Sequence, residues 1–113
     1  MAVNVAVLLE PTPVTTSATG ASYTSNGLTT IIDKCVLTNV GATAKYATVY
    51  LVASGGSAGD TTNAFIYRKT LQPGESYTCP EIVGSALAAG DALQALAETA
   101  GYIIIRSSGR LIS

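Results

Sequence analysis

The sequence predicts an all-β fold, a compact antiparallel β-sandwich with jelly-roll or immunoglobulin-like connections and at most one short helical turn. Roughly seven or eight short apolar segments are separated by turn signals rich in Gly, Pro, Asn and Asp, and little of the chain has helical periodicity. A chain of 113 residues can bury a core as one domain without a metal or a disulfide framework. We therefore expect one β-sandwich domain over residues 14–113, preceded by residues 1–13 as an N-terminal arm or edge strand.

The first segment, residues 2–9, is apolar and predicts a strand. Pro11 and Pro13 follow it and cannot donate to a strand ladder. As an arm the segment would add to a neighbour's sheet edge, whereas otherwise it is an edge strand of its own domain. It has no basic stretch typical of a signal peptide, and no run in the chain is long enough for a membrane span, so we expect synthesis in the cytoplasm.

The middle of the chain predicts a β-hairpin as its central element. Residues 14–27 form a Ser/Thr/Gly-rich loop with one irregular strand over residues 21–24, and Asn26-Gly27 is a strong turn signal. Residues 28–54 follow as two long strands joined by a tight turn near residues 39–43. Period-two alternation places one set of side chains on the inner face, namely Ile31, Cys35, Leu37, Ala47, Val49 and Leu51.

The second half predicts four further strands, over residues 64–71, 76–80, 92–97 and 102–107. Residues 54–63 are glycine-rich and predict a flexible loop. Residues 82–87 are rich in helix formers and predict a short helical turn, because Gly90-Asp91 interrupts any longer helix. Ser108-Gly109 is expected to separate the last strand from a short segment over residues 110–113.

The chain has two cysteines and no histidine. Cys35 and Cys79 each stand in strand-like alternation with apolar neighbours, which predicts two buried free thiols. Whether they meet depends on a Cα separation that the sequence does not give. A zinc site needs four Cys or His ligands, so we expect no metal, and nothing indicates another cofactor.

We expect no enzymatic activity. The absence of histidine excludes Ser-His-Asp and Cys-His arrangements. The carboxylates of Glu75, Asp91 and Glu98 fall in or beside predicted turns, where solvated or turn-capping acids are common. Only 12% of residues are charged, the net charge is −1, and most Lys and Arg residues are scattered singly, so nucleic-acid binding is not expected.

A charged share well below the usual quarter or so predicts a surface that other subunits partly cover. Six Tyr residues stand against one Phe and no Trp. Tyrosine favours interfaces, because its ring buries area while its hydroxyl finds a partner. The candidate interface lies on the face opposite the predicted core and comprises Val36, Tyr46, Tyr50, Tyr102 and Ile104. Alternatively, both faces of these strands are covered within the same chain, one of them by the N-terminal segment.

Three runs, TNVGATAKYATVYLVASGGSAGD, KTLQPGESYTCPEIVG and LAAGDALQALAETAGYIIIRSSGRLIS, resemble small virion structural proteins of tailed bacteriophages. The resemblance spans residues 30–113 through the order of a hairpin, an L-x-P-G-E turn, an L-x-x-G-D turn and a strand ending in Arg-Ser-Ser-Gly. It implies an all-β subunit without a cofactor, present in many copies on a head, neck or tail. This chain departs from the group at Leu111, where an acidic residue would be expected, and in the long loop at residues 14–27.

The expected function is that of a capsid decoration or cement subunit that stabilises a phage head by packing between capsomers. Its expected partners are copies of itself, as a trimer or ring, and the major capsid protein or other virion proteins. The first alternative is a neck or tail ring component, which is also part of the virion. The second is a glycan- or receptor-binding fibre-tip module, which would keep the tyrosine face exposed to water.

Overall fold

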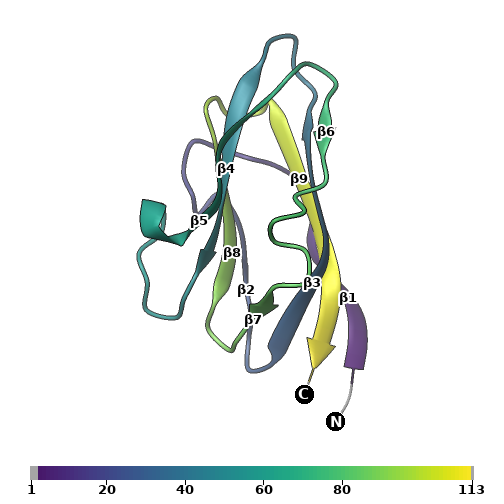
Figure 1. The fold of residues 1–113 in the computed structure, drawn as a ribbon, viewed down its shortest axis with the longest axis vertical. Helices are drawn as coiled ribbons and strands as arrows, with labels where there is room; N and C mark the ends of the chain where they lie inside the picture. Colours follow the sequence, from purple (N-terminus) through teal and green to yellow (C-terminus); the bar gives the residue numbers. More distant parts are fainter. Residues whose placement is uncertain (1–2, 113) are drawn as a thin grey trace.

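The computed structural model describes residues 3–112, which fold into two antiparallel β-sheets packed face to face (Figure 1). The all-β sandwich prediction is thereby confirmed. The strands are β1 (Val3–Pro13), β2 (Ala21–Thr24), β3 (Thr29–Asn39), β4 (Lys45–Val52), β5 (Ala64–Leu71), β6 (Ser76–Tyr77), β7 (Ala86–Leu87), β8 (Ala92–Ala97) and β9 (Ile103–Ile112). One 3₁₀ turn, η1 (Thr61–Asn63), precedes β5.

The strand order is that of a jelly roll. Sheet A has the order β1-β9-β3-β6, with β7 also paired to β3, and sheet B has the order β2-β8-β4-β5. Early strands pair with late ones, β1 with β9, β2 with β8, β3 with β6 and β4 with β5, all antiparallel. This is the pairing of one long antiparallel hairpin wrapped into two sheets. Of the two predicted kinds of connection, the structure has the jelly roll.

The predicted hairpin over residues 28–54 is wrong. Its two strands exist, but β3 belongs to sheet A and β4 to sheet B, so residues 40–44 cross between the sheets. Asn39 holds the crossing: its Nδ2 donates to the carbonyl oxygens of Thr43 and Leu71, and its Oδ1 accepts from the backbone N–H of Gly41, all at 2.9 Å. Alternating residues on either side of a short turn are common to hairpins and to such crossings, so the sequence pattern does not separate them.

Bulges change which residues face the core. In β3 the register shifts between Ile32 and Lys34, so Ile32 is buried instead of the predicted Ile31. In β5, Tyr67 and Arg68 lie together opposite Thr48, and Arg68 has a φ of 50°. The extra residue explains why Ile66 and Leu71 both face inward although their spacing is odd.

Several predicted boundaries are also corrected. The strand predicted over residues 76–80 stops at Tyr77, and residues 82–87 form a turn followed by β7 instead of a helical turn. β9 continues through Gly109 to Ile112 instead of ending near Ser107. Gly109 fits the strand because a Cβ at this position would collide with the backbone oxygen of Ile31 on β3.

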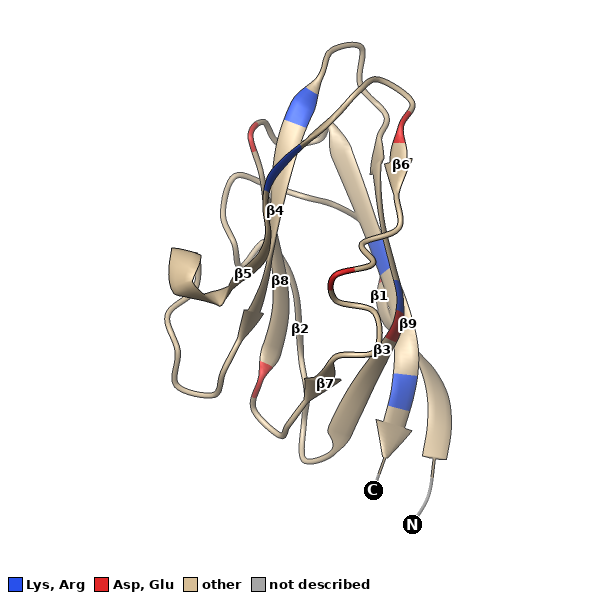
Figure 2. Cartoon of the chain, in the orientation of Figure 1, with Lys and Arg blue, Asp and Glu red and all other residues tan. Residues whose placement is uncertain are grey.

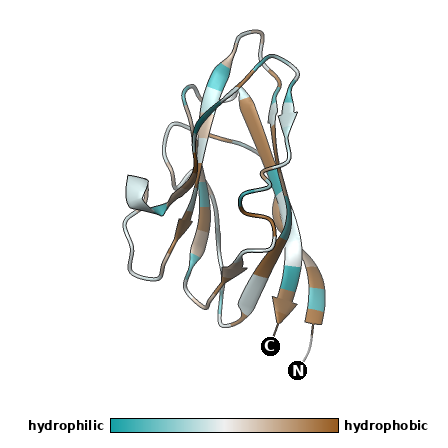
Figure 3. Cartoon of the chain, in the orientation of Figure 1, coloured by the Kyte–Doolittle hydropathy of each residue, from teal (hydrophilic) through white to brown (hydrophobic). Residues whose placement is uncertain are grey.

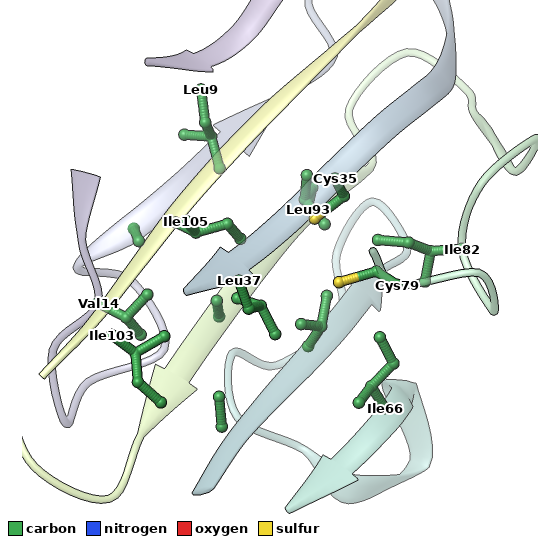
Figure 4. Packing of buried hydrophobic residues seen from close by; sticks show 14 of the residues in the cluster. Leu9, Val14, Cys35, Leu37, Ile66, Cys79, Ile82, Leu93, Ile103 and Ile105 are labelled. Atoms are coloured by element: carbon green, nitrogen blue, oxygen red, sulfur yellow. The ribbon is translucent and has the colours of Figure 1, made fainter. Parts of the chain in front are cut away.

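The main core lies between the two sheets and takes side chains from both (Figure 4). Leu37, Ile103 and Ile105 come from sheet A, and Val49 and Leu93 from sheet B, each fully buried. Leu51 is half-buried and packs against this core. Cys35 and Cys79 are both buried and free, as the sequence predicts.

Candidate interface

The first half of β1 is the one long sheet edge without protection among the described strands. Edge strands are usually blunted by charges, proline, bulges or short length. β2, β6 and β7 have four, two and two residues, and β5 carries a bulge with Arg68 and Lys69 on it. β1 has 11 residues, and from Val3 to Leu9 it contains neither a charge nor a proline. Its register on β9 is regular from Val3 to Val7.

The same stretch carries an exposed apolar row, Val3, Val5 and Val7, with exposed fractions of 52%, 85% and 65%. These residues lie opposite Ile112, Arg110 and Ser108 of β9, on the outer face of sheet A. Between these positions of β9 lie Gly109 and Leu111, which are on the core side of the sheet. Gly109 is buried, and Leu111 packs on the main core. The hydrophobic end of β1 lies beside the N-terminus in Figure 3. We call Val3, Val5 and Val7 the valine row.

A shallow groove of about 620 Å³ continues from the valine row across the outer face of sheet A. Val7, Pro11 and Val36 contribute apolar lining, and Lys34, Arg106 and Glu10 contribute charge. Beside it, Arg110 Nε donates to both carboxylate oxygens of Asp33, at 3.1 and 3.0 Å. Figure 2 shows charge only at scattered positions on this sheet. The end of the sheet next to the valine row is therefore close to neutral.

The five residues of the predicted interface do not form one surface. Val36 and Ile104 are half-buried on the outer face of sheet A. Tyr46 and Tyr50 belong to β4 and face outward from sheet B, on the opposite side of the sandwich. Tyr102 precedes β9, is half-buried and packs against the main core.

Tyr50 is only 4% exposed, so little of its side chain is open to another chain. It packs with Val52 and Ala92 in a second small cluster, which Ala18 of the loop before β2 helps to cover. Burial raises the pKa of the Tyr50 hydroxyl. At Tyr50 the outer face of β4 is therefore covered within the chain, and Ala18 of the Ser/Thr-rich loop contributes to this cover instead of the N-terminal segment.

Tyr46 and Tyr102 have cations of their own chain against their rings. The Arg68 guanidinium carbon lies 5.1 Å from the centroid of the Tyr46 ring and 5.3 Å from that of Tyr67. Lys45 Nζ lies 5.1 Å from the centroid of the Tyr102 ring. One face of each ring is therefore taken, which leaves less tyrosine surface for a ligand than the sequence suggests.

The interface predicted from the sequence does not include the valine row. Its signal was present, because residues 3–7 alternate valine with small or polar residues and carry no charge. The sequence does not show that this strand lies at an edge with its valines turned outward, because that depends on the pairing with β9.

The titratable groups with shifted pKa values reflect local hydrogen bonds or burial. Tyr77 donates to both carboxylate oxygens of Glu81 at 2.6 Å, and this hydrogen bond raises the pKa of Tyr77 to about 12. Asp60 accepts from the backbone and side chain of Thr62, which lowers its pKa. Within residues 3–112, no group of three or more His, Cys, Asp or Glu side chains is placed to hold a metal ion. No helix in that range is long and apolar enough to span a membrane.

No protein-family model, curated protein or solved structure matches this chain. Its function is therefore argued from the surfaces described above and from the resemblance of its sequence motifs.

Proposed function

We propose that this chain is a non-enzymatic structural subunit of a tailed-phage virion, a capsid decoration or cement protein that associates with copies of itself and with the shell. The observation that carries the proposal is the unprotected edge of β1 with its outward valine row. An edge of this kind favours addition of another strand, because main-chain hydrogen bonds and apolar contacts then form together.

A second copy fits this edge in an antiparallel register centred on Val5. In that register Val3 lies opposite Val7 of the second copy, and Val5 lies opposite Val5 of the second copy. The run from Val3 to Leu9 has no charge, so no like charges are opposed. Such self-pairing has two-fold symmetry and closes without forming a filament.

The small size of this contact suits a subunit that acts in many copies. Three partly exposed valines bury far less than the roughly 800 Å² per partner of a standard interface, at about 25 cal/mol per Å² of apolar area. Isolated copies should therefore associate weakly. On a shell that holds many copies at high local concentration, weak contacts add up.

The state of the tyrosines favours packing over the fibre-tip alternative. Jelly rolls occur in both viral coat proteins and lectins, so the fold does not choose between these functions. A sugar site built on the tyrosine face would need free rings, whereas Tyr50 is buried and Arg68 and Lys45 lie against Tyr46 and Tyr102. The neck or tail alternative uses the same kind of packing and differs in location.

The substitution Val5→Lys tests self-association through β1. It places two lysines opposite each other at the two-fold axis, so we expect dimerisation to weaken at least tenfold, with partial recovery at high salt. Sedimentation velocity over a range of concentrations measures this. Val83→Lys is the matched control, because Val83 is also exposed, at 45%, but lies in a turn away from β1. A wild-type chain that stays monomeric at millimolar concentration contradicts pairing through this edge.

Location is tested on particles. Mass spectrometry of purified virions should find the chain in a number that matches sites on the capsid lattice, and imaging should place it on the head. A small fixed number indicates the neck or tail ring instead. Absence from particles, together with binding of the isolated domain on a glycan array, overturns the structural role.

A further inference from the structure

Cys35 lies on β3, and Cys79 follows two residues after the end of β6, the short strand that pairs with β3. β3 and β6 pair antiparallel, with Leu37 opposite Tyr77 and Thr38 opposite Ser76. The same register continues at the other end, where the backbone N–H of Asn39 donates to the carbonyl oxygen of Glu75 at 3.0 Å. Antiparallel partners move one residue at a time in opposite directions, so this register, continued two residues beyond Tyr77, would bring Cys79 opposite Cys35.

Opposed residues of an antiparallel pair have Cα atoms about 4.5–5.5 Å apart. That range lies within the roughly 4.4–6.8 Å that a disulfide spans. Regular pairing stops at Tyr77, and Cys79 has a φ of 50°, a left-handed conformation that is uncommon for a residue with a side chain. Despite this break, Cys79 remains fully buried on the core side, as does Cys35.

The two sulfur atoms reach the same part of the core. Figure 4 shows Cys79 extending its sulfur from the segment after β6 toward the strand that carries Cys35. Interaction with the Cys35 thiol, followed by burial, raises the pKa of the Cys79 thiol. Cys79 Sγ also lies 3.6 Å from the carbonyl oxygen of Tyr77, to which it donates. Both thiols are thus neighbours in the reduced protein.

We infer that Cys35 and Cys79 are a cross-strand disulfide site, reduced where the chain is made and oxidised by a small-molecule disulfide in an oxidising environment. The inference stands on the placement of the two residues and does not depend on the proposed virion role. The bond joins β3 to the segment between β6 and β7, two strands of two residues each that pair with β3.

The reaction is a pair of thiol–disulfide exchanges. One cysteine thiolate attacks a sulfur of oxidised glutathione, which breaks its S–S bond and releases one glutathione thiolate. The second cysteine then attacks the protein sulfur of this mixed disulfide, forms the Cys35–Cys79 bond and releases the second glutathione. Two protein thiols lose two electrons and two protons, and one glutathione disulfide becomes two thiols.

The first exchange requires residues 78–85 to open, because both thiols are fully buried. This segment is irregular and has an exposed outer side that includes Glu81 and Val83. It is anchored by the buried side chain of Ile82 and by the backbone bond from Gly84 to Ile32, at 2.7 Å. Oxidation of the folded chain is therefore limited by local opening.

The test is the equilibrium between the dithiol and the disulfide in glutathione redox buffers. Refolded full-length chain is equilibrated, quenched with an alkylating agent and analysed by peptide mapping. We expect a cross-linked peptide joining Cys35 to Cys79, a mass loss of about 2 Da and a monomer on a non-reducing gel. The effective concentration of the two thiols should be at least 100-fold higher in the folded chain than in guanidinium, where a flexible chain gives about millimolar values.

Thermodynamic linkage supplies an independent readout. A bond favoured by the fold must stabilise the fold, and closing a loop of roughly 45 residues should raise Tm by about 8 to 15 °C over the reduced protein. Cys35→Ala and Cys79→Ala should each remove the oxidant-dependent rise. If either variant fails to fold, the comparison of folded and unfolded wild type still decides the question. Equal effective concentrations in the two states, glutathione adducts without the cross-linked peptide, or dimers linked between chains overturn the inference.

Discussion

At the scale of single residues, Asn39 does most to define this fold. It is completely buried, and its amide group binds three backbone groups in β5 and in the connection between the sheets. A buried backbone group that loses its partner costs about 1–3 kcal/mol. Asn39 therefore sets the path by which the chain leaves sheet A for sheet B.

We expect Asn39→Ala to lower the free energy of unfolding by about 2–4 kcal/mol, because it leaves the carbonyl oxygen of Leu71 and the N–H of Gly41 without this partner. Urea denaturation measures the change. Thr38→Ala is the control on the same strand: its hydroxyl pairs with Ser76 at the surface, so the loss should stay within about 0.5 kcal/mol. Equal effects of the two substitutions would contradict the role assigned to Asn39.

Tyr77 predicts a pH dependence in alkaline solution. Its pKa rises from 10.0 to about 12 in the folded chain, chiefly through the hydrogen bond to Glu81. The folded state therefore holds this proton over a pH range in which the unfolded state has lost it, so the contribution is complete below pH 10 and is lost as the pH rises toward 12.

Tyr77→Phe should accordingly reduce the fall in stability between pH 10 and 12 relative to wild type. Thermal melts across this range measure the difference in stability between wild type and Tyr77→Phe. Titration of the lysines contributes equally to both proteins and cancels in this difference. Tyr67→Phe is the control, because Tyr67 is exposed and forms no comparable bond to a carboxylate among the described residues. An identical pH profile for wild type and Tyr77→Phe would show that the bond to Glu81 does not persist in solution.

At the scale of elements, β1 has two faces with different consequences. On the inner side Leu8 and Leu9 are each 8% exposed and belong to the main core. On the outer side the valine row is open to solvent. Register shifts on both sides of Leu9 interrupt the alternation of the strand. Leu8 and Leu9 therefore both face inward although they are adjacent.

Deleting residues 2–13 should therefore disrupt the domain, beyond any effect on association. The deletion removes two core leucines, each worth about 2–5 kcal/mol, and leaves β9 with a free edge, against a total stability of about 5–15 kcal/mol. Near-UV circular dichroism and the loss of a cooperative melting transition measure this. Val5→Lys, which touches only the outer side, should retain the wild-type Tm. A truncated chain with an unchanged melt would show that β1 is dispensable for the core.

At the scale of the whole molecule, the jelly-roll wrapping brings the first and last described residues together. β1 and β9 run side by side along one edge of sheet A (Figure 1), and Val3 pairs with Ile112. The described domain measures 46 × 26 × 20 Å. The valine row lies on the outer face of sheet A. On sheet B, Ala18 packs on Tyr50 and Arg68 lies against Tyr46, while Phe65 and Tyr67 stay 49% and 56% exposed. Apolar side chains are thus exposed on both sheets, and the unprotected edge of β1 is what supports association through sheet A.

The sequence by itself determined the all-β class, most of the strands and the burial of Cys35, Leu37, Ala47 and Val49. These follow from alternation and turn residues, which are local properties of the chain. It did not determine that β3 and β4 enter different sheets, that bulges bring Ile32 and Leu71 inward, or that Tyr50 is covered. Each of these depends on which strands pair and what packs above them, and pairing partners far apart in the sequence leave no local signal. Tertiary structure alone therefore placed the valine row at an open edge and brought Cys79 into the core beside the strand that carries Cys35.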